Sequence, residues 1–473
     1  MEQTTRVHAF TDDALGESDA TGVAARIAAR DISAGEAVEA AIARSASVEE
    51  KLSGLHRSDF DRARARATRS SSCDGPFAGV PSLFKDNIMV GGMAMTQGSR
   101  AFGTAPRPTD GAVAAQYLAT GIIPIGTSTM PEFGWTCTTE TLDYRTHNPW
   151  DTSYSSGGSS GGSAAYVAAG VVPIAHGNDG GGSIRIPAHA CGLVGLKPTR
   201  GRLRIDSGDR ILPVHITSNS VLARSVRDVA GFFAAAEKVH RNRMLKPMGV
   251  VDRAQQRPLR IGLLINSPAS DVRTDDETRA AINAFGLQLE ALGHHVEPYE
   301  WKIPATFKED FSSYWMLLAY LASTGTAKTF GPGYDPGKLE PLTKFLSAEG
   351  KKRLMKAPIF IPRLLASSVI ARRQMRGGPD VVVSPVLSGP TPPLGYLGAD
   401  VDPAVHFRRL IDLCAFTPWH NATGAPAISL PVGTSTDGMP IGAMVTATHG
   451  AEAVLLRLAL QVEAAHPWRR IQD

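Results

Sequence analysis

The segment SSGGSSGGSAAYVAAGVVPIAHGNDGGGS, residues 155–183, holds two serine–glycine clusters separated by a short apolar stretch. Residues 162–170 are small and predict a helix that can pack with its backbone close to a neighbour, and residues 171–175 predict a buried strand leading into the second cluster. Glycine runs let consecutive backbone N–H groups point toward one position, where they bind an anion or a developing oxyanion. A serine beside such a nest is suited to acyl transfer, whereas a flexible linker would lack the flanking helix and strand.

Strand and helix signals continue on both sides of this segment. The pattern predicts helices over residues 21–30, 35–44, 58–68, 111–120 and 451–464, and strands over residues 77–80, 122–125, 260–264, 381–384 and 427–432. Strands that alternate with helices favour an α/β fold, here a single large domain over residues 1–473 with a mixed central β-sheet flanked by helices. A helical, cap-like region at about 300–375 carries aromatic residues that we expect to wall a pocket: Tyr314, Trp315, Tyr320, Phe330 and Tyr334.

Composition excludes several classes of protein. The 473 residues carry a formal charge of only +4, with the basic residues spread out, so we expect no nucleic-acid partner. Residues 1–10 lack the apolar core of a secretory signal and no run approaches 18 apolar residues, which predicts a cytoplasmic protein with no membrane partner. The 13 histidines form no ligand-spaced cluster, and we expect neither metal nor cofactor. The four cysteines lie far apart and are expected to be free thiols: Cys73, Cys137, Cys191 and Cys414.

A serine nucleophile needs a base, and neither cluster has a histidine close in sequence. Lysine can serve if burial lowers its pKa from ~10.4 toward neutrality, a shift of roughly 3 units. Lys85 follows an apolar run and has Leu83 and Phe84 beside it. Taken alone, this lysine fits an ordinary surface position as well as a catalytic one.

Several motifs together resemble the amidase-signature family. They are the paired-serine run at 155–163, GGSIRIP at 181–187, GLKPT at 195–199, MPEF at 130–133 and GMPIG at 438–442. The resemblance spans most of the chain and has its signature core at about 75–230. It implies a hydrolase that cleaves amide-like C–N bonds and works without metal or cofactor.

The resemblance also implies roles for individual residues. Lys85 is expected to be the general base and Ser183 the nucleophile, with Ser159 bridging them after a cis peptide bond from Gly158. Asp179 and Arg185 are expected to hold the loop as scaffold. The expected oxyanion hole consists of the backbone N–H groups of Gly180, Gly181, Gly182 and Ser183.

The sequence departs from the family pattern at several places. Gly180 stands where threonine is common, and residues 217–222 lack the usual Asp-x-x-Gly-Pro stretch. Trp419 and His420 replace a smaller or apolar pair and are expected to line the pocket. Arg210 lies on a loop that we expect to reach the mouth of the substrate site.

Two alternatives stay open. GGSSG at 157–161 satisfies the G-x-S-x-G elbow, which would make Ser159 the nucleophile of an α/β-hydrolase-type esterase with a distant partner such as His420. The chain could also be one subunit of a glutamine-dependent amidotransferase. A phosphate-binding protein is disfavoured, because no G-x-x-x-x-G-K-[ST] motif occurs.

The substrate is expected to be a small molecule. Relatives that the resemblance suggests include aryl acylamidases, a cyclic nylon-oligomer hydrolase and urethane hydrolases. We therefore expect an aryl amide, an anilide or a carbamate (urethane) substrate, ester cleavage as a side activity, and a monomer or homodimer.

Overall fold

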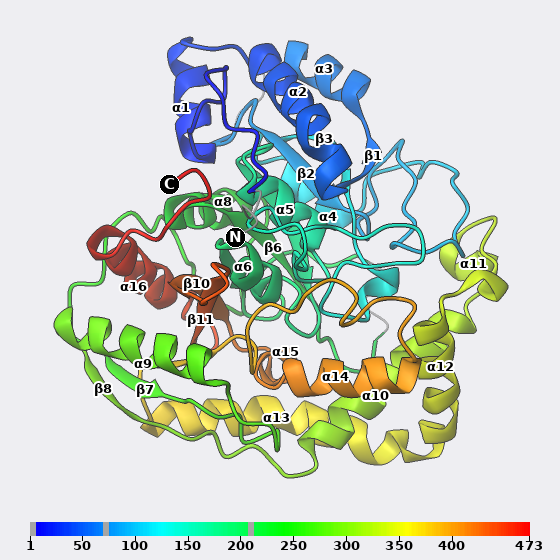
Figure 1. The fold of residues 1–473 in the computed structure, drawn as a ribbon, viewed down its shortest axis with the longest axis vertical. Coiled ribbons are helices and arrows are strands. Elements are labelled where there is room, and N and C mark those ends of the chain that lie inside the picture. Colours follow the sequence, from blue (N-terminus) through cyan, green and yellow to red (C-terminus); the bar gives the residue numbers. More distant parts are fainter. Residues whose placement is uncertain (1–5, 70–74, 207–211) are drawn as a thin grey trace.

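The computed structural model describes residues 6–69, 75–206 and 212–473. Its centre is a mixed eight-stranded sheet (Figure 1). Neighbouring strands run antiparallel across most of the sheet, and the last two pairs at one edge are parallel. The spatial order is β4 (Ile174–Asp179), β6 (Ser218–Ala223), β5 (Val194–Lys197), β10 (Ala427–Thr434), β11 (Pro440–Ala447), β9 (Val381–Pro385), β7 (Arg260–Leu263) and β8 (His295–Pro298).

A second, three-stranded sheet positions Lys85. In it β3 (Ile123–Ser128) lies between β1 (Leu55–Ser58), which is antiparallel to it, and β2 (Pro81–Lys85), which is parallel to it. Strand β2 also lies beside β4, and the hydroxyl of Ser82 donates to the carbonyl of Ile174 at 2.9 Å. Lys85, the last residue of β2, therefore lies near the end of β4, where the second glycine cluster begins.

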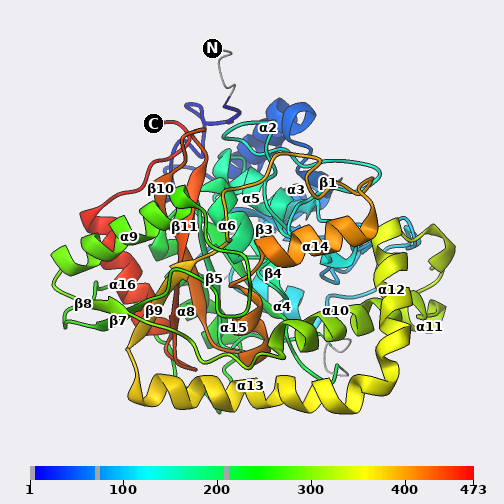
Figure 2. The same ribbon diagram turned by 60° about the horizontal axis from the view of Figure 1, so that its bottom comes forward.

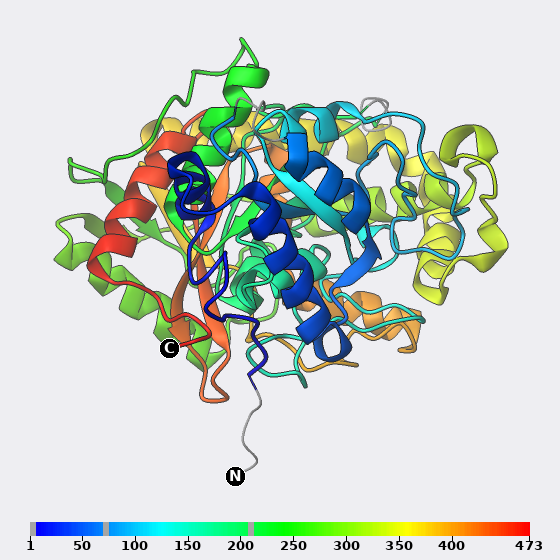
Figure 3. The same cartoon turned by 90° about the horizontal axis from the view of Figure 1, so that it is seen from above.

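Helices cover both sheets. The pair α2 and α3 lies across the small sheet, as the view from above shows (Figure 3). Helix α2 begins at a capping box, in which Ser33 and Glu36 satisfy each other's backbone N–H groups. The helices of this part are α1 (Ala20–Ala29), α2 (Ala34–Leu52), α3 (Phe60–Arg69), α4 (Ala112–Leu118), η2 (Glu132–Gly134), α5 (Gly161–Ala168), α6 (Arg185–Cys191), α8 (Val226–Val239), α9 (Asp276–Ala291) and α16 (Glu452–Ala465).

A separate group of helices packs around a second apolar core and forms the lower part of the molecule in Figure 2. It contains α10 (Phe307–Ser323), α11 (Ala327–Phe330), η3 (Pro336–Lys338), α12 (Pro341–Arg353), η4 (Leu354–Lys356), α13 (Ala357–Gly377), α14 (Pro403–Leu413) and α15 (Pro418–Thr423). This second core adjoins the glycine cluster through Trp135 and Ile186. It thereby supplies the apolar walls of the site described below.

The α/β architecture, the mixed sheet and the helical region at 300–375 are confirmed. Two expected strands are displaced along the chain: residues 77–80 form a turn and the strand is 81–85, while the strand expected at 171–175 is 174–179. Phe77 and Val80 are buried, but the Val80 N–H donates to the Phe77 carbonyl across the turn. Their apolar character reflects burial in a turn, which a search for apolar runs cannot separate from a strand.

Candidate active site

Lys85 is buried beside a serine hydroxyl. Its side chain is 1% exposed, and its Nζ donates to Ser159 Oγ at 2.7 Å and to the Asn178 carbonyl at 3.3 Å. Burial lowers the pKa of Lys85 to about 7, although the nearby Asp179 carboxylate acts in the opposite direction. A large fraction of Lys85 is therefore neutral near pH 7 and can accept a proton.

Ser159 follows a cis peptide bond from Gly158, as expected. Its hydroxyl is enclosed: a Cβ on Gly134 would come within 2.7 Å of Ser159 Oγ, so that position accommodates only glycine. Ser159 is 2% exposed, and its hydroxyl accepts a hydrogen bond from Lys85. Lys85 and Ser159 are thus brought together by β2 and by the loop before α5.

A buried histidine that sequence reasoning missed supports Lys85 from behind. His176 Nδ1 accepts the backbone N–H of Lys85 at 3.3 Å, and its Nε2 lies 3.1 Å from Asn219 Oδ1. The accepting Nδ1 requires the proton to be on Nε2, so the ring is neutral. Burial lowers the pKa of His176 to about 3, which keeps it neutral at every pH where the protein would work. We infer that His176 fixes the end of β2 and takes no proton.

The second glycine cluster presents unused backbone donors. Among the residues that the structure describes, the N–H groups of Gly180, Gly181 and Ser183 have no protein partner, whereas the Gly182 N–H donates to Asp179 Oδ1 at 2.8 Å. The Gly181 carbonyl accepts the Thr417 hydroxyl at 2.5 Å. Of the four expected oxyanion donors, three remain free to bind a substrate oxygen, and Gly182 instead serves the loop's own geometry.

Asp179 and Arg185 hold this loop, in the scaffold role expected for them. Both side chains are fully buried, and the guanidinium donates two hydrogen bonds of 2.9 Å to the carboxylate. Asp179 also accepts the N–H groups of Gly182 and Ile184 and the amide of Asn421. Burial opposes ionisation, but the charge and hydrogen bonds of Arg185 outweigh it and hold the pKa of Asp179 well below its usual range.

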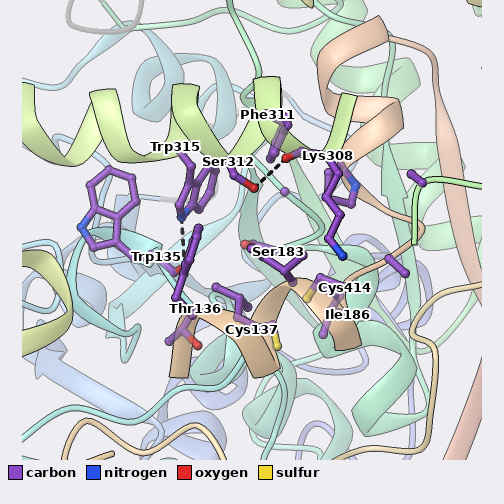
Figure 4. Close-up of a pocket in the computed structure, with 18 of the residues that line it drawn as sticks. Trp135, Thr136, Cys137, Ser183, Ile186, Lys308, Phe311, Ser312, Trp315 and Cys414 are labelled. Atoms are coloured by element: carbon purple, nitrogen blue, oxygen red, sulfur yellow. Dashed lines mark hydrogen bonds between the residues drawn. The ribbon is translucent and has the colours of Figure 1, made fainter. Parts of the chain in front are cut away.

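Ser183 opens into an apolar pocket (Figure 4). Trp315 on α10 lies over the glycine loop, since a Cβ on Gly181 would meet its ring at 3.5 Å, and its Nε1 donates to the Trp135 carbonyl at 3.2 Å. Among the described residues that line the pocket, Lys308, also on α10, is the one charged residue, and Figure 4 shows its side chain extending into the pocket. The rest of the wall is largely aromatic or aliphatic and includes Ile186, Phe307, Phe311, Phe407, Leu410, Ile411 and Pro418.

Of the residues expected to line the pocket, some do and others do not. Trp419 and His420 do not line this pocket: Trp419 packs against Phe307 in the second core, and His420 Nε2 lies 2.9 Å from Thr446 Oγ1. Arg210 lies outside the described residues. Of the five aromatics expected in the wall, only Trp315 lines it. Tyr314 is fully buried with its hydroxyl donating to the Val214 carbonyl.

Three of the four cysteines are described, and all three are buried free thiols. Cys137 and Cys414 belong to the pocket wall, a position that was not predicted from the sequence. Cys73 lies outside the described residues. Within residues 6–69, 75–206 and 212–473, no group of three or more histidine, cysteine or acidic side chains is arranged to hold a metal ion.

Comparison with known proteins assigns the chain to a family. The family model described as Amidase matches residues 36–456. A protein of Mycobacterium leprae named as amidase AmiC is 44% identical over 471 residues, 99% of each chain. The 6-aminohexanoate-cyclic-dimer hydrolase of Paenarthrobacter ureafaciens is 34% identical over 482 residues, 95% of each chain.

Solved structures with a similar fold belong to the same family. A structure of 6-aminohexanoate cyclic dimer hydrolase superposes with a TM-score of 0.87 at 31% identity, covering 98% of this chain and 99% of the other. A bacterial aryl acylamidase of the amidase-signature family has the same fold, with a TM-score of 0.83 at 24% identity over 96% and 98% of the two chains. The chain therefore belongs to the amidase family and is a hydrolase of amide bonds.

Proposed function

We propose that this protein hydrolyses aryl amides, anilides or carbamates through an acyl-enzyme on Ser183, with Lys85 and Ser159 relaying the proton. The observation that carries the proposal is the 2.7 Å contact between Lys85 Nζ and Ser159 Oγ in a fully buried site. A lysine whose pKa is about 7 is suited to general-base work near neutral pH.

In the proposed mechanism neutral Lys85 accepts the proton of Ser159, and Ser159 accepts the proton of Ser183 as Ser183 Oγ attacks the substrate carbonyl carbon. The carbonyl oxygen becomes an oxyanion, stabilised by the free N–H groups of Gly180, Gly181 and Ser183. The proton then passes back through Ser159 to the leaving nitrogen, because an amide nitrogen leaves poorly as an anion. The C–N bond breaks, and an ester on Ser183 remains.

Water completes the cycle. It gives a proton to the same relay while its oxygen attacks the ester carbon, and the collapse of this second intermediate releases the acid and restores the Ser183 hydroxyl. On a carbamate, the same C–N cleavage releases the amine and leaves an alkoxycarbonyl group on Ser183, which water releases as a carbonic acid monoester. On a small ester, the alcohol takes the relayed proton and leaves in place of the amine, and water then releases the acid. We therefore propose urethane and ester cleavage as side activities of one site.

The pocket supports the substrate class. Its aromatic wall, with Trp315, Phe311 and Phe407, favours a flat or apolar group next to the scissile bond. One relative by name fits an aromatic substrate, an aryl acylamidase, whereas another is a hydrolase of a cyclic 6-aminohexanoate dimer, which is an aliphatic amide. A glutamine amidotransferase subunit would need a polar pocket for the glutamine amide, which makes this alternative the weaker one.

The esterase alternative with Ser159 as nucleophile is disfavoured by its partners. Ser159 Oγ is hydrogen-bonded to Lys85. His420, the histidine expected to act as its base in that alternative, instead lies beside Thr446. Ser183 belongs to the pocket lining, whereas Ser159 does not.

Chromogenic hydrolysis of a p-nitroanilide by point variants tests the relay. We expect Ser183→Ala to lower kcat by roughly 10⁴-fold or more, and Ser159→Ala and Lys85→Ala by roughly 10³-fold. Ser160→Ala is the matched control, since its hydroxyl bonds only the backbone of Asn178. Mass spectrometry of the wild type during turnover should find the acyl group on the peptide that contains Ser183. An acylated Ser159 peptide would overturn the proposal.

The substrate class is tested separately with a panel of anilides, aryl carbamates and aliphatic amides. Faster turnover of the aromatic members is expected. Brisk hydrolysis of the aliphatic amides alone would leave the relay in place and remove the substrate proposal.

A further inference from the structure

Helix α13 carries an apolar face that nothing in the described part of the chain covers. The helix runs along the outer edge of the molecule (Figures 1 and 2). Its inner face is buried against α10 and α15 through Phe360, Leu364, Ser367, Ala371 and Met375. On its outward side and on the preceding turn lie five of the exposed large apolar residues, with exposed fractions of 36–89%: Leu354, Met355, Ile359, Leu365 and Val369.

The clustering of these residues is unusual for a protein surface. Isolated exposed apolar residues are normal, but a contiguous set marks a surface that binds something. The five lie within 16 residues of one another in sequence, and successive members fall on the side of the helix opposite the buried positions. Ile359, Leu365 and Val369 lie on the outward half of α13, and Leu354 and Met355 lie on the preceding turn, η4. These five residues, here called the apolar stripe, extend over about four turns.

Basic residues bracket the apolar stripe. Residues 351–377 contain eight basic side chains and no acidic one. In the described part of the chain, Lys352 and Arg353 pair with Glu349, and Arg363 lies 3.5 Å from Asp310 of α10. The other five have no acidic partner in the described part of the chain: Lys351, Lys356, Arg372, Arg373 and Arg376.

We propose that the outer face of α13, with the turn before it, binds peripherally to the surface of an anionic lipid bilayer. An apolar stripe flanked by unpaired Lys and Arg is the pattern of a helix that lies in the interface between lipid headgroups and acyl chains. The apolar side chains enter the bilayer, and the basic side chains contact anionic headgroups. This differs from the expectation, drawn from composition, of a protein without a membrane partner.

The charge also argues against a second copy of the chain as the occupant. Two such faces packed together would bring ten unpaired positive charges close to one another, which disfavours association unless anions intervene. The surface of an anionic bilayer presents negatively charged headgroups across the whole face of the helix. Charge complementarity therefore selects the lipid surface.

The geometry fits a helix on the surface and not one through the bilayer. By length and composition the stretch Pro341–Gly377 is long and apolar enough to cross a membrane. It consists, however, of α12, η4 and α13, and the inner face of α13 packs on protein. Because α10 lines the pocket and packs against α13, the bilayer would lie on the same side of the molecule as the pocket helix. The inference does not depend on which amide is hydrolysed.

Vesicle sedimentation with the full chain tests the proposal. Vesicles of phosphatidylcholine alone are compared with vesicles that contain 30% phosphatidylserine, at low and at physiological salt. We expect roughly tenfold or stronger binding to the anionic vesicles and a decrease as salt rises. No binding to anionic vesicles at low salt would overturn the proposal.

Two double variants separate the two parts of the surface. Ile359→Glu with Val369→Glu alters the stripe, and Arg372→Gln with Arg376→Gln removes charge; each should weaken binding by roughly tenfold or more. Val250→Glu is the matched control, because Val250 is 69% exposed on another part of the surface. All three should keep wild-type nitroanilide turnover, since none of these residues lines the pocket. Vesicle binding that none of the α13 changes reduces would show that another surface is responsible.

Light scattering on the same samples tests whether a second copy of the chain binds the apolar stripe instead. A wild-type dimer that the Ile359→Glu and Val369→Glu variant dissociates, together with an absence of vesicle binding, would assign the stripe to a second copy of the chain and overturn the proposal.

Discussion

Lys85 Nζ donates to Ser159 Oγ at 2.7 Å, although the lysine is 1% exposed and no carboxylate of the described residues forms an ion pair with it. A buried ammonium without a contacting counter-ion is costly, and the protein reduces that cost by releasing the proton at a lower pH. The acidic group whose charge acts on Lys85, Asp179, is paired with Arg185. The arrangement therefore keeps a base, and not a cation, next to the serine.

The first prediction concerns pH. Burial lowers the pKa of Lys85 from 10.5 to about 7, and only the unprotonated amine can accept the serine proton. Lys85 is protonated below pH 7 and neutral above it, so kcat/KM should rise about tenfold per pH unit at low pH and level off above about 7. A pH–rate profile with a nitroanilide measures this.

Lys197 provides the matched control for that profile. It is also fully buried, and burial lowers its pKa to about 7, yet its Nζ donates to the Pro198 carbonyl and not to Ser159. Lys197→Met should therefore leave the rising limb at the same pH. If the limb moves or disappears in Lys197→Met, then Lys85 is not the group that titrates.

The second prediction concerns the scaffold. Asp179→Asn keeps the shape of the side chain but leaves the Arg185 guanidinium buried without a counter-charge, and should lower the free energy of unfolding by about 3–5 kcal/mol. It should also lower kcat, because the carboxylate accepts the Gly182 and Ile184 N–H groups that shape the loop. Denaturant titration and nitroanilide turnover measure the two effects.

Asp143→Asn controls for the loss of an ion pair as such. Asp143 pairs with Arg100, and both side chains are about half exposed, so the loss should stay below about 1 kcal/mol. Equal losses in the two variants would mean that the buried Asp179–Arg185 pair contributes no more than a surface pair.

Sequence reasoning and the structure agree where a motif is local. Lys85 and Ser159 were expected in one site because of the resemblance to the amidase-signature family, whose motifs are local in sequence, and the structure brings the two side chains into contact. The pocket could not be predicted, because its wall combines Trp135, α10 and α14, which are far apart in the chain and meet only through the second core.

Trp419 and His420 show that the direction of a side chain within one helical turn could not be predicted from the sequence. Pro418 lines the pocket, but successive residues of α15 are rotated by about 100° around the helix axis, which turns the next two side chains into the core. The resemblance to the family pattern placed them near the site and left the direction of their side chains undetermined. His176 was missed for a similar reason: only its tertiary contact with the end of β2 relates it to Lys85.

The third prediction concerns the substrate pocket. Trp315→Ala removes the ring that lies over Gly180 and Gly181 and should lower kcat/KM for an aryl anilide by roughly 10–100-fold, mainly through KM. Bulkier acyl groups should lose less or improve. Tyr320→Ala is the control, since Tyr320 lies on the same helix outside the pocket lining. Equal losses in both variants would indicate a general effect on α10.

The last prediction separates the glycines of the nest by what each position can hold. Gly182 has φ +136°, and a Cβ there would meet Thr417 Oγ1 at 2.5 Å, so Gly182→Ala must displace the loop and should lower kcat by roughly 100-fold or more. At Gly180 a Cβ would meet only ordinary contacts, at 3.6 Å or more from Thr217 and Trp315. Gly180→Thr, which introduces the residue common in the family, should therefore fold normally and keep kcat within roughly tenfold. Circular dichroism and nitroanilide kinetics on both variants measure these effects. If Gly180→Thr is as inactive as Gly182→Ala, the absence of a side chain at Gly180 is itself required for substrate binding. If both variants are active, the loop is not the oxyanion site.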